Sequence, residues 1–183
     1  MSCYILSDNT IKMNLSQHIK SNKPDAIKKG YFTKAYLYNK SNEVILESRC
    51  YIKECMAMGW FPKSSLFPEI SFSELKSNKN EYRVYKMPLY TTNSRSVKSI
   101  ICKEDYKNIY LRLRKIMFVS DYTDFKMKLI SVSVSDEVRE TLLKAYEACM
   151  LYDTDVNWEI SPRNVAATPE GRLILMDCFY IES

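Results

Sequence analysis

The chain is poor in the residues on which several classes of binding site depend. Its 183 residues include three glycines and one histidine, and no two cysteines have the CxxC spacing of a zinc site. Dinucleotide-binding folds and P-loops need several glycines so that the backbone can approach phosphates, and this composition excludes them. With six scattered cysteines and one histidine, we expect no zinc site and reduced thiols.

Long apolar runs are also missing. The N-terminal region has no apolar signal-peptide core, and no stretch of about 18 apolar residues occurs. We therefore expect no membrane partner and a cytoplasmic location. The net charge of +5, from 27 Lys+Arg and 22 Asp+Glu, is small for a dedicated nucleic-acid-binding protein, so nucleic acid is the weaker expectation for a partner.

The apolar pattern predicts one α+β domain, because runs typical of strands come first and helical spacing follows. Residues 1–29 are expected to form an N-terminal extension with a weak helical stretch at 11–19. The predicted elements after it are a hairpin at 31–46, a helix at 51–60, extended segments at 66–72 and 81–90, helices at 102–117 and 135–151, and a hairpin at 165–176.

Three polar residues, Glu159, Asn164 and Asp177, surround the last predicted hairpin. Such a hairpin brings them toward one edge. Carboxylate and amide oxygens are the ligands that Mg²⁺ prefers, and nucleotide phosphates complete its coordination shell. The alternative is that Asp177 only caps the hairpin and that no nucleotide site exists.

This segment resembles the protein-kinase family. Glu159-Ile160-Ser161-Pro162-Arg163-Asn164 is similar to the kinase catalytic loop, in which an acid is followed five positions later by a metal-binding Asn. Asp177 follows Asn164 by 13 residues, as in many kinases. Upstream, Gly30-Tyr31-Phe32-Thr33-Lys34-Ala35-Tyr36 looks like the end of a glycine-rich phosphate loop.

The resemblance, strongest to the small early protein kinases of T7-like bacteriophages, implies a minimal two-lobed fold with a truncated C-lobe. Residues 30–90 would form the N-lobe and residues 91–183 the reduced C-lobe. ATP and Mg²⁺ are the implied cofactors. The implied roles are the catalytic base position for Glu159, nucleotide binding for Gly30, Phe32 and Lys53, and metal binding for Asn164 and Asp177.

The sequence also departs from the kinase pattern. Leu46 stands where a kinase has the third-strand lysine, with Lys34 and Lys53 as the nearest substitutes. Glu159 is one methylene longer than the usual Asp, and misplacement by about 1 Å can cost about 100-fold in rate. Only six residues follow Asp177 in the sequence, so the substrate-holding helices of ordinary kinases have no counterpart.

These matches and departures lead to a principal hypothesis and two alternatives. The principal hypothesis is a phage-type pseudokinase that binds a host protein, for host takeover or counter-defence, with nucleotide binding weak or absent. One alternative is an active atypical Ser/Thr protein kinase. The other is a small basic regulator associated with nucleic acid, in which the basic helix predicted over residues 102–117 contacts phosphates.

Overall fold

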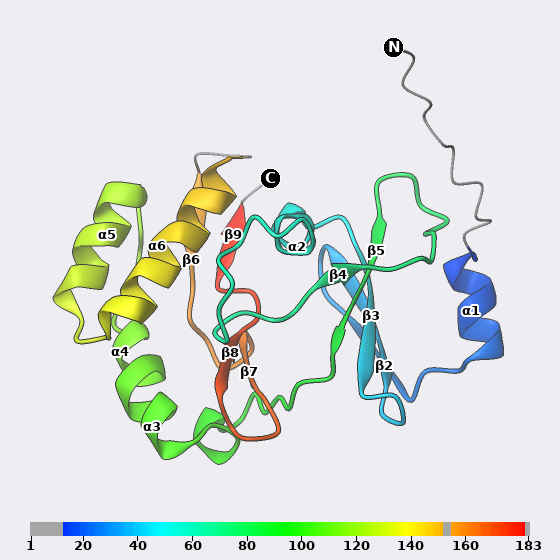
Figure 1. Ribbon diagram of the computed structural model, residues 1–183, viewed down its shortest axis with the longest axis horizontal. Coiled ribbons are helices and arrows are strands. Elements are labelled where there is room, and N and C mark those ends of the chain that lie inside the picture. Colours follow the sequence, from blue (N-terminus) through cyan, green and yellow to red (C-terminus); the bar gives the residue numbers. More distant parts are fainter. Residues whose placement is uncertain (1–12, 152–154, 182–183) are drawn as a thin grey trace, which may run out of the picture.

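The computed structural model describes residues 13–151 and 155–181. Helices and antiparallel sheets are both present, which confirms the α+β class predicted from the sequence. A five-stranded sheet lies on one side of the molecule, and most of the helices lie on the other, with two small sheets beside them (Figure 1). No helix in these two ranges is long and apolar enough to cross a membrane.

The large sheet contains five antiparallel strands in the order β1-β2-β3-β5-β4. Their bounds are β1 Ala26–Lys29, β2 Thr33–Tyr38, β3 Glu43–Ser48, β4 Ser71–Phe72 and β5 Arg83–Pro88. The β2–β3 hairpin confirms the one predicted over residues 31–46, and Asn42 in its turn has a φ of 52°, which asparagine tolerates better than most residues. The central strand β3 buries side chains on both faces, with Ile45 in one apolar cluster and Val44 and Leu46 in another.

The segment before residue 30 contributes to this sheet. Helix α1 (Leu15–Ser21) overlaps the helical stretch expected at 11–19, and Leu15 is buried in the same cluster as Tyr36 of β2. Strand β1 pairs with β2 along its whole length. The sheet therefore begins four residues before the boundary expected at residue 30, because β2 offers β1 a complete set of backbone partners. Residues 1–12 of the expected extension lie outside the described residues.

Helix α2 (Tyr51–Ala57) is the one helix expected among the strands of the N-terminal half. Its last residue is Ala57, Met58 is the C-cap, and Gly59 follows with a φ of +75°, which confirms the predicted end near this glycine. Ile52 and Cys55 belong to the main core on the side of the C-terminal helices, and α2 contacts helix α6 (Asp136–Met150). α2 thus connects the large sheet to the rest of the fold.

The helix predicted over residues 102–117 is present in an irregular form. A single helical stretch runs from residue 103 to 113 after the short 3-10 helix η1 (Val97–Ser99). Its parts are α3 Lys103–Asp105, the π-helical segment η2 Tyr106–Tyr110, and α4 Leu111–Leu113. The stretch ends four residues earlier than predicted.

Helix α5 (Tyr122–Ser131) was not predicted. Asp121 caps it by accepting a hydrogen bond from the Asp124 backbone N–H at 2.9 Å, and Phe125 and Leu129 are buried one turn apart. The capping residue followed by apolar side chains at four-residue spacing was the signal that sequence reasoning missed.

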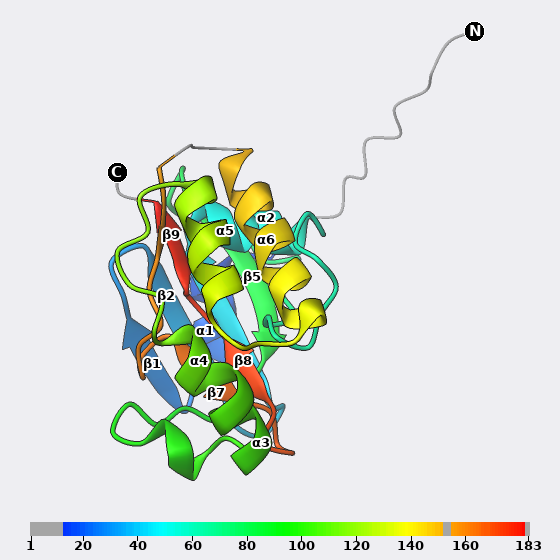
Figure 2. The same ribbon diagram turned by 90° about the vertical axis from the view of Figure 1, so that its left-hand side faces the viewer.

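Helices α5 and α6 pack side by side (Figure 2). Aromatic side chains pack together between them and the β6–β9 pair. The Ser135 side chain accepts a hydrogen bond from the Val138 N–H, so α6 begins where the sequence predicted. Tyr146 of α6 stacks on Phe125 of α5 at 4.9 Å between ring centroids, and its hydroxyl donates to the Val156 carbonyl at 2.8 Å. The buried phenol thus has both an apolar contact and a hydrogen-bond partner.

Two short antiparallel pairs complete the fold. Their bounds are β6 Val156–Trp158 with β9 Phe179–Ile181, and β7 Val165–Ala167 with β8 Leu173–Leu175. The β7–β8 pair confirms the hairpin predicted at 165–176. The carbonyl of Gly171, in its turn, accepts from the Cys102 N–H at 2.7 Å, which attaches the hairpin to the start of α3. The β6–β9 pairing was not predicted.

Candidate functional site

A cavity of about 1060 Å³ lies between the large sheet and the loops that carry the predicted site residues. Its walls come from β1, β2, β3 and β5, from α2, from the segments before β4 and after β5, and from short pieces of chain on either side of the β7–β8 hairpin. The apolar part of the wall includes Ala35, Leu37, Val44, Leu46, Ile70, Met87 and Leu89, and the charged part comprises Lys28, Lys29, Lys53, Arg95, Arg163 and Asp177.

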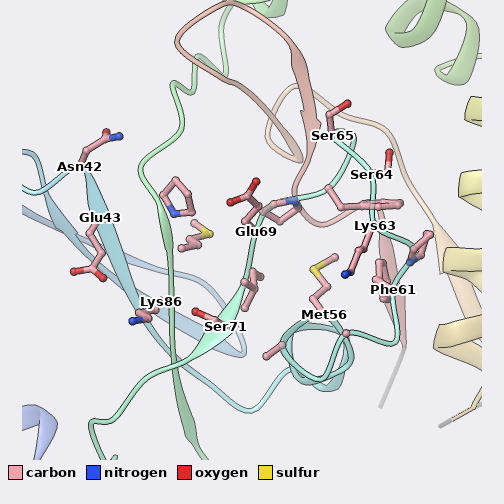
Figure 3. A pocket seen from close by; sticks show the side chains of 18 of the residues that line it. Asn42, Glu43, Met56, Phe61, Lys63, Ser64, Ser65, Glu69, Ser71 and Lys86 are labelled. Atoms are coloured by element: carbon pink, nitrogen blue, oxygen red, sulfur yellow. The ribbon is translucent and has the colours of Figure 1, made fainter.

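A second hollow of about 1180 Å³ lies beside β3, β5 and the loop that follows α2. Figure 3 shows Glu43 and Lys86 on its strand side and Lys63 and Glu69 on its loop side. These charges balance, and none of the site residues predicted from the sequence lines it. The first cavity is therefore the candidate functional site.

An ion pair between Lys53 and Asp177 is the main polar feature of the candidate site. The Lys53 ammonium lies 2.5 Å from a carboxylate oxygen of Asp177, and the two residues are 124 positions apart in the chain. Only 10% of the Lys53 side chain is exposed, against 58% of the Asp177 side chain. The pair thus brings a cation from the first turn of α2 next to the segment between β8 and β9.

The environment of Lys53 keeps its side chain charged. Burial alone lowers the pKa of an ammonium group, but attraction to the Asp177 carboxylate and to Cys50, together with the hydrogen bond to Asp177, outweighs this effect, so the pKa of Lys53 is raised above its ordinary value. Lys53 is therefore a permanent cation at neutral pH in the wall of the cavity.

The other residues considered for the lysine role lie elsewhere. Leu46 lines the cavity and offers it only methyl groups. Lys34 is outside the cavity lining, and its ammonium sits over the Tyr36 ring at 4.8 Å. Of the two substitutes expected from the sequence, Lys53 is the one that reaches the cavity.

Of the two residues that the resemblance assigns to the phosphate loop, one lines the cavity and the other does not. Gly30 lines the cavity, and its N–H donates to the Thr33 carbonyl at 2.8 Å, which closes a tight turn between β1 and β2. Phe32 is outside the lining. Its ring contacts Tyr31 edge-on at 4.6 Å and lies under the Arg49 guanidinium at 5.0 Å. Phe32 thus packs on its neighbours and does not contribute to the cavity wall.

Of the three polar residues near the β7–β8 hairpin, only Asp177 lines the cavity. The Asn164 carbonyl accepts from the Met176 N–H at 2.8 Å, so the backbones of the two predicted metal-binding segments are adjacent. The Asn164 side chain is absent from the lining, and Glu159 is exposed and also outside it. Residues 13–151 and 155–181 contain no group of three acidic, histidine or cysteine side chains suited to holding a metal ion.

Sequence reasoning missed most of the cations of the cavity. Lys28 and Lys29 come just before the predicted phosphate loop, and Arg163 lies within the segment that resembles the catalytic loop. Arg95 belongs to the segment after β5. The Lys-Lys-Gly run was a usable signal, but nothing in the sequence places Arg95 near it.

Comparison with protein-family models, curated proteins and solved structures finds no match to this chain.

Proposed function

We propose that this protein is a kinase-like nucleotide-binding protein of the pseudokinase type, in which phosphoryl transfer is weak or absent. The observation that carries the proposal is the Lys53–Asp177 ion pair in the wall of a large cavity. A pair of this kind, joining a lysine of the strand-rich half to an acid after the C-terminal hairpin, supports the two-lobed kinase-like arrangement.

The cavity has the properties of a nucleotide site. Its volume of about 1060 Å³ is slightly above the usual range of about 300–1,000 Å³ for small-molecule sites, and one part of the wall is apolar enough to contact a base. The other part presents lysine and arginine side chains, which bind phosphate oxygens through charge-assisted hydrogen bonds. The turn at Gly30 lies between β1 and β2, beside the lysines of β1.

The arrangement favours binding over transfer. Phosphoryl transfer depends on positioning and on neutralisation of charge, and it needs an acid close to the attacking hydroxyl. Glu159 is exposed outside the cavity, and the carboxylate of Asp177 is already engaged by Lys53. An active Ser/Thr kinase would need both carboxylates free inside the cavity, and neither is.

We expect Lys53→Met to weaken ATP binding at least tenfold, because loss of the buried ammonium removes a charge-assisted contact to phosphate. Thermal-shift titration with ATP, with and without Mg²⁺, measures this. Lys107→Met is the matched control, because Lys107 is exposed on η2 and does not line the cavity.

Two outcomes count against the proposal, one in this titration and one in a phosphorylation assay with Mg²⁺ and ATP. If ATP produces no shift at millimolar concentration in either medium, the cavity is not a nucleotide site. If the protein phosphorylates generic substrates and Asp177→Asn abolishes this activity, the active-kinase alternative holds instead.

The proposal includes docking on a partner protein, and exposed apolar side chains around α5 support this part. Phe118 is 86% exposed and has a φ of 52°, an uncommon conformation for a bulky residue. The Lys128 ammonium donates a hydrogen bond to the Phe118 carbonyl at 2.6 Å. Met127 and Ile130 are exposed one turn apart on the outer side of α5.

The charges beside this apolar surface indicate the character of the partner. The Asp124 carboxylate forms an ion pair with the Lys128 ammonium at 2.7 Å, whereas Lys115 and Lys126 form no ion pair with any described residue. An apolar surface with unpaired lysines fits a protein segment that combines apolar side chains with Asp or Glu. The exposed methionine, isoleucine and phenylalanine favour such a partner over nucleic acid.

Photo-crosslinking in the producing cell tests the docking surface. With benzoylphenylalanine in place of Phe118, we expect crosslinks to a partner segment rich in acidic and apolar residues. Met127→Ser together with Ile130→Ser should reduce them at least tenfold. The control position is Leu151, which is 71% exposed at the end of α6. Crosslinks that are equal at both positions, or that go only to lipid, would contradict docking at α5.

A further inference from the structure

We infer that the cavity binds its nucleotide as a free polyphosphate anion, with cationic side chains in the place that a magnesium ion would otherwise take. This inference rests on the proposed function and specifies the charge state of the ligand. It departs from the metal-binding role that the sequence suggested for Asn164 and Asp177.

The Asp177 carboxylate, which the kinase resemblance assigns to Mg²⁺, already forms an ion pair with Lys53. Asp177 lies 2.5 Å from the Lys53 ammonium, and that ammonium is largely withdrawn from water. A divalent cation on the same carboxylate would lie a few ångströms from a buried positive charge, where little water screens the repulsion. Binding of the metal would require Lys53 to leave its partner.

The remaining oxygen ligands do not converge on the cavity. Mg²⁺ needs near-octahedral oxygen coordination, for which proteins usually supply one or two carboxylates. Glu159 and Asn164 are both outside the lining, so Asp177 is the single acidic group of the described residues that faces the cavity. The donor set therefore does not fit the metal that the kinase resemblance implies.

Cations are the abundant groups instead. Besides Lys53, the lining contains Lys28, Lys29, Arg95 and Arg163, and none of these four forms an ion pair with a described residue. The Lys28 ammonium donates a hydrogen bond to the Thr92 hydroxyl, at 3.3 Å. A nucleoside triphosphate without metal has its full negative charge, which this surplus of cations complements, whereas bound Mg²⁺ would cancel much of that charge.

Isothermal titration of the full chain tests the inference with ATP as the probe, once in excess EDTA and once in millimolar Mg²⁺. We expect binding in EDTA to be at least threefold tighter than binding in Mg²⁺. Arg163→Ala and Lys29→Ala change exposed residues, and each should weaken binding in EDTA about tenfold. Glu159→Gln, Asn164→Ala and the control Lys107→Ala should leave it unchanged.

A third arm uses inorganic tripolyphosphate, which has the charge but not the base. If the apolar wall contributes, ATP binds more tightly than tripolyphosphate. Equal affinities would show that the cavity recognises phosphates alone and would overturn the nucleotide part of the inference.

The failures of the two proposals are distinguishable. ATP binding that requires Mg²⁺ and is lost in EDTA, or that weakens tenfold in Glu159→Gln or Asn164→Ala, overturns the metal-free inference and leaves the nucleotide-binding function standing. Absence of ATP binding in both media overturns the proposed function, and the inference with it.

Discussion

Phe125→Ala should lower the free energy of unfolding by about 3–5 kcal/mol, the largest effect that we expect from a single substitution in this protein. Phe125 has no exposed surface, and its ring centroid lies 4.9 Å from that of Tyr146, 5.1 Å from Trp158 and 5.9 Å from Phe179. Removing the ring leaves a cavity where α5, α6 and the β6–β9 pair meet. Domains are stable by only about 5–15 kcal/mol, so the loss is a large part of the total.

Urea unfolding followed by circular dichroism measures this loss, and Phe118→Ala is the matched control. Both substitutions remove the same side chain, but Phe118 is 86% exposed, so we expect the control to change stability by less than about 0.5 kcal/mol. Similar losses in the two variants would contradict the packing described for α5.

Asp177→Asn should lower stability by about 2 kcal/mol at pH 7, and this loss should shrink as the pH rises. Removing the carboxylate leaves the buried Lys53 ammonium without its partner, which is costly. The value is below that of a fully buried pair, because 58% of the Asp177 side chain is exposed.

The direction of the pH dependence follows from the pKa of Lys53. In the wild type this pKa is raised above the ordinary value of 10.5, so the stabilisation is fully present below pH 10.5 and is lost as the pH rises through the folded-state pKa. In Asp177→Asn, burial is opposed only by the smaller effect of Cys50, so it lowers the pKa of Lys53. The folded variant then binds fewer protons than the unfolded chain, and its stability rises toward pH 10.5, by at most about 1.4 kcal/mol per pH unit.

Denaturant unfolding of the wild type and Asp177→Asn between pH 7 and pH 10.5 measures the difference. Lys53→Met and the double variant with Asp177→Asn are the controls, because neither contains the ammonium. The difference in the free energy of unfolding between these two variants should stay constant with pH. A loss in Asp177→Asn that is equally constant with pH would show that Lys53 is not the titrating group.

The candidate site could be predicted from the sequence only in part. Gly30 and Asp177 were identified from local motifs and Lys53 as a substitute for the missing third-strand lysine, and all three line the cavity. Phe32 was identified in the same way, but its ring packs on Tyr31 and lies under the Arg49 guanidinium. A motif fixes which residues are near one another along the chain, and it does not fix the side of the strand or loop on which each side chain lies.

The sequence by itself determined the local elements of this protein, because their signals lie within a few neighbouring residues. The hairpin of β2 and β3, the end of α2 near Gly59, the start of α6 at Ser135 and the β7–β8 hairpin are all where turn residues and apolar spacing placed them. Turn chemistry, capping and periodicity act over short distances along the chain.

Only the tertiary structure decided the long-range contacts. The pairing of β6 with β9, the contact between Gly171 and Cys102, and the 2.5 Å ion pair between Lys53 and Asp177 join segments about 20 to 124 residues apart. The cations of the cavity come from β1, α2, the segment after β5 and the loop before β7, and each looks like a solvated surface charge in its own segment. They form one site because α2, whose Met56 packs against both the main core and the apolar cluster of β3 and β5, holds the large sheet beside the C-terminal half, and no local pattern in the sequence records that packing.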